Sequence, residues 1–169
     1  MVKIILLNLF LISSLVMNAQ NNKPIPVIFD TDMGPDYDDV GAMALLHAFA
    51  DSGKADILAT IACTKYEGVA AVINVLNTYF KRPQLLIGVP RHNALTKKDW
   101  QHWTDTLIKN YPHAINNNND VADAVEVYRQ VLAKQPDKSV AQVGRRRDGA
   151  LLGRGSDAGG RGRPGKALP

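Results

Sequence analysis

Apolar segments of two kinds alternate along most of this 169-residue chain. Short apolar runs are typical of buried strands and occur near residues 25–30, 56–62, 84–88 and 138–143. Longer runs with helical spacing lie near residues 39–51, 67–81, 99–110 and 119–134. Strands that alternate with helices pair in parallel through right-handed crossovers. The sequence therefore predicts an α/β fold, an open and mostly parallel sheet with flanking helices, Rossmann-like in form.

The run from Asp30 to Asp39 joins the first predicted strand to the first predicted helix and contains five aspartates. Its flanks are apolar, which places it at the rim of a core. Crowded carboxylates repel one another, and burying them is costly unless a cation or hydrogen-bond donors compensate. Hard cations such as calcium bind several carboxylate oxygens at once, and ligands of open α/β sheets bind at the carboxyl ends of strands. This run therefore predicts a metal site with a chemical role.

Simpler roles for the acidic run are a solvated turn, which the apolar flanks argue against, and a helix start. Asp38 or Asp39 suits a helix start, where a carboxylate accepts hydrogen bonds from exposed N–H groups and complements the helix dipole. A calcium loop of the EF-hand type fits poorly. Gly34 stands at its third ligand position, Pro35 at its turn glycine and Gly41 at its final glutamate.

The order strand, Asp-x-Asp, Gly, Asp-Asp, helix resembles the amino-terminal signature of the inosine-uridine preferring nucleoside hydrolases. The chain matches a longer form of that loop, in which residues 33–37 separate Asp32 from the pair Asp38-Asp39. The resemblance extends over about residues 24–140 and includes the second and third predicted strands and the helix between them. It implies a nucleoside-hydrolase-like form of the predicted sheet.

This resemblance implies a hydrolase that cleaves the N-glycosidic bond of ribonucleosides, giving ribose and free base, with a water molecule bound to Ca²⁺. It matches Asp32 to the metal-bound general base and Asp39 to the carboxylate that binds calcium through both oxygens. Asp38 matches the residue that binds a ribose hydroxyl, and Asp30 is close enough to orient its neighbours. Asp36 has no counterpart. The chemistry agrees, because carboxylates stabilise an oxocarbenium-like transition state and a metal acidifies its bound water.

The chain departs from the family pattern in two respects. Lys65-Tyr66 follows the second predicted strand where the family often has a ribose-contacting Gly-Asn pair, which leaves the substrate open. Family members are also longer, and their remaining calcium ligands come from the later part. We therefore expect this chain to be a truncated, inactive version of the enzyme, with an apolar sheet edge left exposed.

Residues 1–20 have the pattern of an export signal, with Lys3, an apolar stretch of thirteen residues and the small residue Ala19. The stretch is short for a membrane span, which needs about 20 apolar residues. We expect an exported protein, periplasmic or secreted, without stable membrane insertion after cleavage of the signal. An uncleaved anchor is the alternative.

Residues 141–169 differ in composition from the rest and hold seven of the chain's 20 basic residues and eight of its 13 glycines. Without them the formal net charge falls from +4 to −1. Such a basic, glycine-rich tail cannot bury a core and predicts disorder, and the abrupt change after Val140 also fits a shifted reading frame. Clustered arginines suit nucleic acid, but the tail has no aromatic residue to stack on bases, so we expect no nucleic-acid partner.

The predicted organisation is a signal peptide at residues 1–20, the amino-terminal part of a nucleoside hydrolase domain at 21–140 and the tail at 141–169. The expected partner is a small nucleoside, and a homo-oligomer is possible for the full-length form. Two other functions stay open. One is a haloacid-dehalogenase-like phosphatase, which would use Asp30 as its nucleophile, and the other is a non-catalytic fragment that binds calcium or ribosides.

Two local predictions concern residues outside the acidic run. Cys63 is the only cysteine, so an internal disulfide is excluded, and we expect its thiol to be buried in the second strand. The polar run at residues 116–119 is predicted to be a surface loop, with Asn119 or Asp120 capping the helix that follows.

Overall fold

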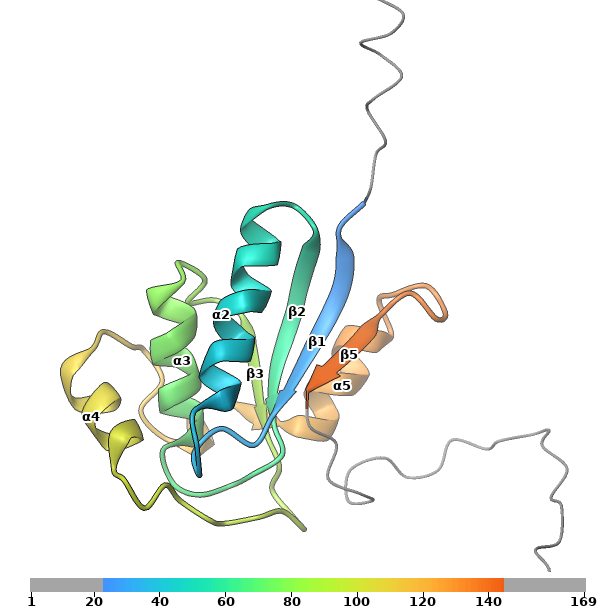
Figure 1. Ribbon diagram of the computed structural model, residues 1–169. Coiled ribbons are helices and arrows are strands. Elements are labelled where there is room, and N and C mark those ends of the chain that lie inside the picture. Colours follow the sequence, from blue (N-terminus) through green and yellow to red (C-terminus); the bar gives the residue numbers. More distant parts are fainter. Residues whose placement is uncertain (1–22, 145–169) are drawn as a thin grey trace, which may run out of the picture.

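The computed structural model describes residues 23–144, in which five strands form one sheet whose neighbouring strands all run parallel. The order across the sheet is β4-β3-β2-β1-β5, so β2 is central and β5 is an edge strand beside β1 (Figure 1). The predicted open, parallel α/β fold is confirmed. The strands are β1 (Ile25–Thr31), β2 (Ala55–Ala62), β3 (Leu86–Val89), β4 (Ala122–Asp123) and β5 (Ala141–Gly144).

Helices cover both faces of this sheet. In Figure 1, α2 and α3 lie side by side on one face, α4 lies beyond α3, and α5 lies on the opposite face. Within the described residues the helices are α2 (Asp38–Asp51), α3 (Val69–Tyr79), α4 (Trp103–Asn110), α5 (Ala124–Leu132) and the short 3₁₀ helix η1 (Asn118–Asp120).

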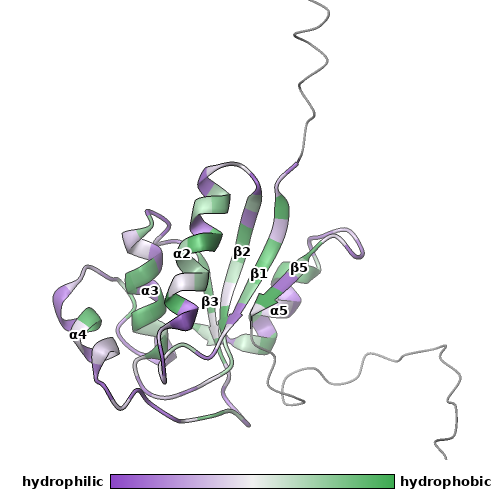
Figure 2. Cartoon of the chain, in the orientation of Figure 1, coloured by the Kyte–Doolittle hydropathy of each residue, from purple (hydrophilic) through white to green (hydrophobic). Residues whose placement is uncertain are grey.

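Alternation of side chains along β1 divides the core into two parts. Val27 and Phe29 pack in the cluster beneath α2 and α3, whereas Ile28 packs in the cluster beneath α5. Figure 2 shows hydrophobic residues along the strands and hydrophilic ones where β1 gives way to α2. A parallel sheet buried on both faces is the expected arrangement. The apolar core around β1 therefore ends directly at the acidic loop.

Helix α3 is buried along nearly its whole length, from Val69 to Asn77. Its polar side chains fix the surrounding loops, because Asn74 Oδ1 accepts a hydrogen bond from Ala114 N at 2.8 Å and Asn74 Nδ2 donates to Pro83 O at 3.2 Å. The predicted helix is therefore confirmed. The buried amide of Asn74 binds two neighbouring loops to it through hydrogen bonds.

The main differences from the predicted elements lie between residues 99 and 134. The helix predicted at 99–110 begins at Trp103, and the one predicted at 119–134 begins at Ala124, after η1 and β4. The cap of α5 is Asp123, whose side chain accepts a hydrogen bond from Val125 N at 2.8 Å. Prediction of this cap at residue 119 or 120 was wrong, because those residues belong to η1.

The polar run at residues 116–119 is not simply a surface loop, because Asn118 is 7% exposed. Its Oδ1 accepts a hydrogen bond from Ala70 N at 3.2 Å, and its Nδ2 donates to Tyr66 O at 2.9 Å. One buried amide thus caps the first turn of α3 and ties the preceding loop to it.

The last predicted strand occurs as β5, but later than residues 138–143 and largely exposed. The segment assigned to the tail from residue 141 therefore begins inside the sheet. The remainder of that segment, 145–169, and the predicted signal peptide lie outside the described residues. Between residues 23 and 144, none of the helices combines the length and apolar character needed to cross a bilayer.

Candidate active site

The acidic run lies in the loop between the carboxyl end of β1 and α2, as predicted (Figure 1). Asp30 belongs to β1, Asp32 follows the strand, and Asp38 and Asp39 open α2. The exposed fractions of Asp30, Asp32 and Asp39 are 7%, 6% and 7%. Asp38 is exposed to solvent. Three buried acids at the end of one strand require compensation by donors or by a cation.

Two hydrogen bonds shape the turn after β1. Asp39 Oδ2 accepts one from Asp32 N at 3.1 Å, and Thr31 Oγ1 accepts one from Met33 N at 3.0 Å. The first bond folds the start of α2 back onto the end of β1. It brings together Asp32 and Asp39, the two residues that the family resemblance assigns to calcium.

The pKa of Asp39 is raised to about 6. Burial is the main cause, and the shared hydrogen bond with Asp32 and the negative charges of Asp32 and Asp38 act in the same direction, while a hydrogen bond from Thr31 opposes them. A carboxylate in this state gains stability from any nearby positive charge. A cation bound near Asp39 would therefore stabilise the ionised form of this carboxyl group.

Cys63 borders the same cluster, which its position in the sequence did not reveal. It lies just after β2 and is half-buried, and its N–H donates to Thr31 O at 2.8 Å. Burial, followed by the charges of Asp30, Asp32 and Asp39, raises the pKa of the thiol to about 12. A thiol with such a pKa is a poor nucleophile at neutral pH. The parallel pairing of β1 with β2 brings it there.

Asp30 is held from the other side of the sheet. Its Oδ2 accepts hydrogen bonds from Tyr128 Oη at 3.1 Å and from Gln142 Nε2 at 2.9 Å. These donors lie 98 and 112 positions further along the chain, in α5 and β5. Sequence reasoning missed both, because no local pattern connects such distant residues.

Aromatic side chains hold the long form of the loop. Gly34 has a φ of +144°, and a Cβ at this position would lie 2.6 Å from Cε1 of Tyr66. Trp103 Nε1 donates to Gly34 O at 3.0 Å, and the rings of Tyr37 and Trp103 form an edge-to-face pair with centroids 6.0 Å apart. Tyr66 is buried, and burial raises its pKa. At the position of the family's ribose contact, this chain therefore has a packing residue.

The donor atoms of Asp32 and Asp39 suit calcium, which prefers hard oxygen ligands. Calcium takes about 6–8 such oxygens, however, so two carboxylates fill only part of its shell. Between residues 23 and 144, no three side chains among His, Cys, Asp and Glu are grouped to hold one metal ion. Asp32 and Asp39 alone would therefore leave a calcium ion short of ligands, and further oxygens would have to come from water, substrate or other parts of the protein.

No protein-family model matches the chain, and no curated protein matches it. An α/β fold by itself is shared by proteins of many activities. The function of this chain therefore has to be inferred from the acidic loop.

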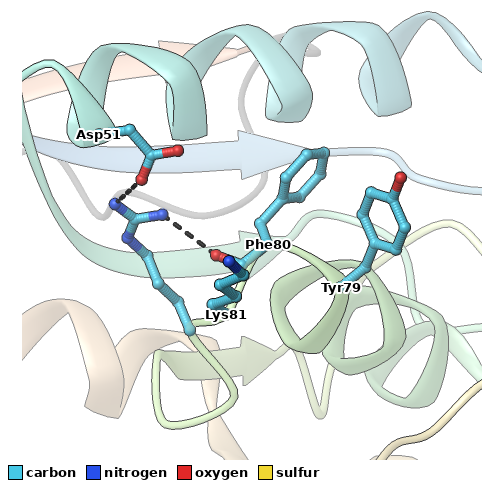
Figure 3. A pocket seen from close by; sticks show the side chains of 5 residues that line it. Asp51, Tyr79, Phe80 and Lys81 are labelled. Carbon is cyan, nitrogen blue, oxygen red and sulfur yellow. Dashed lines mark hydrogen bonds and ion pairs between the residues drawn. The ribbon is translucent and has the colours of Figure 1, made fainter.

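A pocket of about 470 Å³ lies away from this loop, among Asp51, Tyr79, Phe80, Lys81 and Arg82 (Figure 3). It is formed by residues at the carboxyl ends of α2 and α3, whereas the acidic loop lies at the amino end of α2. Arg82 donates to Asp51 Oδ1 at 2.6 Å and to Phe80 O at 3.2 Å. The positive charge of Arg82 at the carboxyl ends of two helices is stabilising, so we assign the residues around this pocket a structural role.

Proposed function

We propose that the acidic loop is part of the active site of an N-glycosyl hydrolase that cleaves ribonucleosides to ribose and free base, like the nucleoside hydrolases the chain resembles, and that the 169-residue chain itself is inactive. The observation that supports this is the burial of Asp30, Asp32 and Asp39 together at the carboxyl end of β1, with the pKa of Asp39 raised to about 6. Bound calcium would supply the positive charge that such a cluster favours and would acidify a water molecule.

The proposed roles are those that the family resemblance gives to each side chain, and the positions of the side chains support them. Asp32 directly follows β1, with its N–H donating to Asp39, and its carboxylate would accept a proton from the attacking water. Asp39, whose Oδ2 already accepts the Asp32 N–H, would bind calcium. Asp38 is exposed on the first turn of α2, where a ribose hydroxyl reaches it from solvent.

The phosphatase alternative requires Asp30 to attack phosphorus. One feature disfavours this role, because Asp30 Oδ2 already accepts hydrogen bonds from Tyr128 and Gln142. A nucleophilic carboxylate needs access to its substrate. The remaining alternative, a fragment that binds calcium or ribosides without turnover, differs from the proposal only in catalysis.

Calcium binding by the whole chain tests the proposal. We expect calcium to raise the thermal unfolding midpoint of the wild type and to leave that of Asp32→Asn/Asp39→Asn unchanged, because binding to the folded state stabilises it. Asp36→Asn changes an exposed aspartate of the same loop and should keep the response. A thermal unfolding midpoint of the wild type that does not change on addition of calcium would contradict the proposal.

Turnover is tested with inosine and uridine, in calcium and in a chelator. We expect no hydrolysis by the 169-residue chain, because residues 23–144 bring together too few calcium ligands. We expect hydrolysis, sensitive to Asp32→Asn, from a longer protein that carries the same loop. Robust turnover by the 169 residues would show that they form a complete site.

We also propose that the protein is exported, on the pattern of residues 1–20. Mass spectrometry of the protein from periplasm and medium tests this. The expected product lacks roughly the first 20 residues, the span of a typical signal peptide. An intact amino terminus in the cytoplasmic fraction alone would show the opposite.

A further inference from the structure

We propose that Tyr128 and Gln142 are positioning residues of the acidic site, which hold Asp30 in place and thereby set the calcium affinity of Asp32 and Asp39. The inference rests on the proposed calcium site. It adds two residues from distant elements, α5 and β5, to a site otherwise built from one loop.

Within residues 23–144, Tyr128 is the one residue with a polar group among the buried members of the hydrophobic cluster beneath α5. Asp30 follows Ile28 by two positions on β1 and so shares its face, the one covered by α5. Phenylalanine would fill the same space there without burying a hydroxyl, and a buried hydroxyl is costly unless it is hydrogen-bonded. The other buried members of this cluster are Ile28, Ala59, Ile61, Ala124, Val127 and Val131. The hydroxyl is therefore explained by its bond to Asp30.

Gln142 completes a closed triangle of hydrogen bonds. Its Nε2 donates to Asp30 Oδ2 at 2.9 Å and to Tyr128 Oη at 2.9 Å, while Tyr128 Oη donates to the same Asp30 oxygen at 3.1 Å. Two donors converging on one carboxylate oxygen fix its orientation more firmly than a single donor. The triangle thus determines the direction of the Asp30 side chain.

The position of Asp30 matters for the calcium ligands because only Thr31 separates it from Asp32. The charges of Asp30, Asp32 and Asp39 all act on Cys63, so the three carboxylates belong to one electrostatic cluster. An Asp30 that turned would change both the charge density and the path of the backbone into Asp32. Groups hydrogen-bonded directly to metal ligands commonly affect metal affinity by about 10- to 100-fold, and Tyr128 and Gln142 act one step further out, through Asp30.

A purely structural role for the triangle, joining β5 and α5 to β1, predicts a different result. Loss of one bond would then lower stability but leave calcium affinity unchanged. The two roles are separated by measuring both quantities on the same variants of the whole chain. Tyr128→Phe removes the hydroxyl and keeps the ring, and Gln142→Leu removes the amide.

Calcium titration by calorimetry is the first measurement. We expect Tyr128→Phe and Gln142→Leu each to weaken calcium binding by about tenfold, the lower end of the range for groups bonded directly to metal ligands. Tyr111→Phe and Gln130→Leu alter exposed residues and should change it by less than about twofold, the scatter expected for independent sites. Equal calcium affinities of the wild type and Tyr128→Phe would overturn the inference and leave the proposed function standing.

The second measurement asks whether Tyr128 acts through Asp30. In an Asp30→Ala background, Tyr128→Phe should weaken calcium binding no further, because its acceptor is gone. The same weakening in both backgrounds would overturn the inference. Asp30→Val, which also lacks an acceptor, takes the place of Asp30→Ala if circular dichroism shows the latter unfolded. A wild type that binds no calcium would overturn both the proposed function and this inference.

Discussion

Single residues of the acidic loop are held in positions that cost stability. Asp39 is 7% exposed, and its pKa is raised above the ordinary 3.8 to about 6. Gly34 adopts a backbone conformation that other residues avoid, with the Tyr66 ring against it. Strain and buried charge of this kind concentrate at functional sites. Both features allow direct tests.

Asp39→Asn should stabilise the calcium-free protein near neutral pH. In the wild type, unfolded Asp39 loses its proton near pH 3.8 while the folded residue keeps it up to about pH 6, so stability falls as pH rises through this window. Two pKa units correspond to about 3 kcal/mol, which solvent near the loop reduces to about 1–2 kcal/mol. Asparagine does not ionise and escapes this loss.

Urea unfolding in a chelator, at several pH values from 4 to 7.5, measures this effect. The free energy of unfolding of the variant relative to the wild type should increase across this range by about 1–2 kcal/mol. If the free energies of unfolding of the two proteins changed with pH in parallel, ionisation of Asp39 would not destabilise the folded state.

Gly34→Ala should destabilise the protein by about 2–4 kcal/mol, because it combines an unfavourable positive φ with overpacking. The added Cβ would lie 2.6 Å from the Tyr66 ring. The matched control is Gly41→Ala on the exposed side of α2, where nothing lies within 4 Å. It should stabilise by about 0.5–1 kcal/mol. Chemical denaturation of both variants checks the contrast, and a neutral Gly34→Ala would refute the tight contact.

At the scale of elements, the end of α3 shows how a helix stops without glycine. Lys81 N donates to Thr78 O at 2.9 Å, Arg82 N donates to Asn77 O at 2.8 Å, and Lys81 has a φ of 62°. This pattern is the glycine-favouring helix end, occupied here by a lysine. The left-handed conformation is disfavoured for any residue that has a Cβ.

Lys81→Gly should therefore stabilise the protein by about 0.5–1 kcal/mol, as relief of the strain outweighs the added flexibility of the unfolded chain. Lys81→Ala is the control, because it removes the same charge and keeps the Cβ. It should not stabilise. Thermal unfolding of both variants gives the comparison, and equal gains would assign the effect to charge.

Elements with a strong apolar pattern could be predicted from the sequence. The strand before Asp30 and the buried helix α3 are examples, because their patterns are long and uninterrupted. β4 could not be predicted, since two residues have no periodicity, and the polar run before it hid the buried amide of Asn118. The boundary at Asp123 depends on a cap that only the tertiary structure selects.

At the scale of the whole molecule, burial is uneven. Helix α3 is enclosed by the sheet and by α2 and α4, whereas β5 lies at an edge with most of its residues exposed. Local opening follows such differences in burial. The acidic loop lies between the buried part of the molecule and the exposed edge. One side of it packs on the core, and on the other side Gln142 of β5 donates a hydrogen bond to Asp30.

Hydrogen exchange should follow this gradient. We expect amides of β1, β2 and α3 to exchange slower than those of α4 and β5 by at least about tenfold, because opening them exposes the shared core. Exchange measured by mass spectrometry at peptide resolution checks the order. Equal rates in α3 and α4 would show that the described residues open as one unit.

The candidate site was predictable only in part, for a physical reason. The carboxylates are neighbours in the sequence, so their clustering after a strand could be predicted. Cys63, Tyr128 and Gln142 reach the cluster through strand pairing and helix packing, which no local pattern encodes. The sequence therefore indicated the charges of the site but not the groups around them.

The triangle of Asp30, Tyr128 and Gln142 has a consequence for the order in which the site forms during translation. Asp30 leaves the ribosome early, and its last partner follows 112 positions later. Domains generally fold as units once their parts are synthesised. A nascent chain would thus carry its acidic loop without the Gln142 donor until β5 emerges, and the proposed calcium binding would reach its full strength only at that late stage.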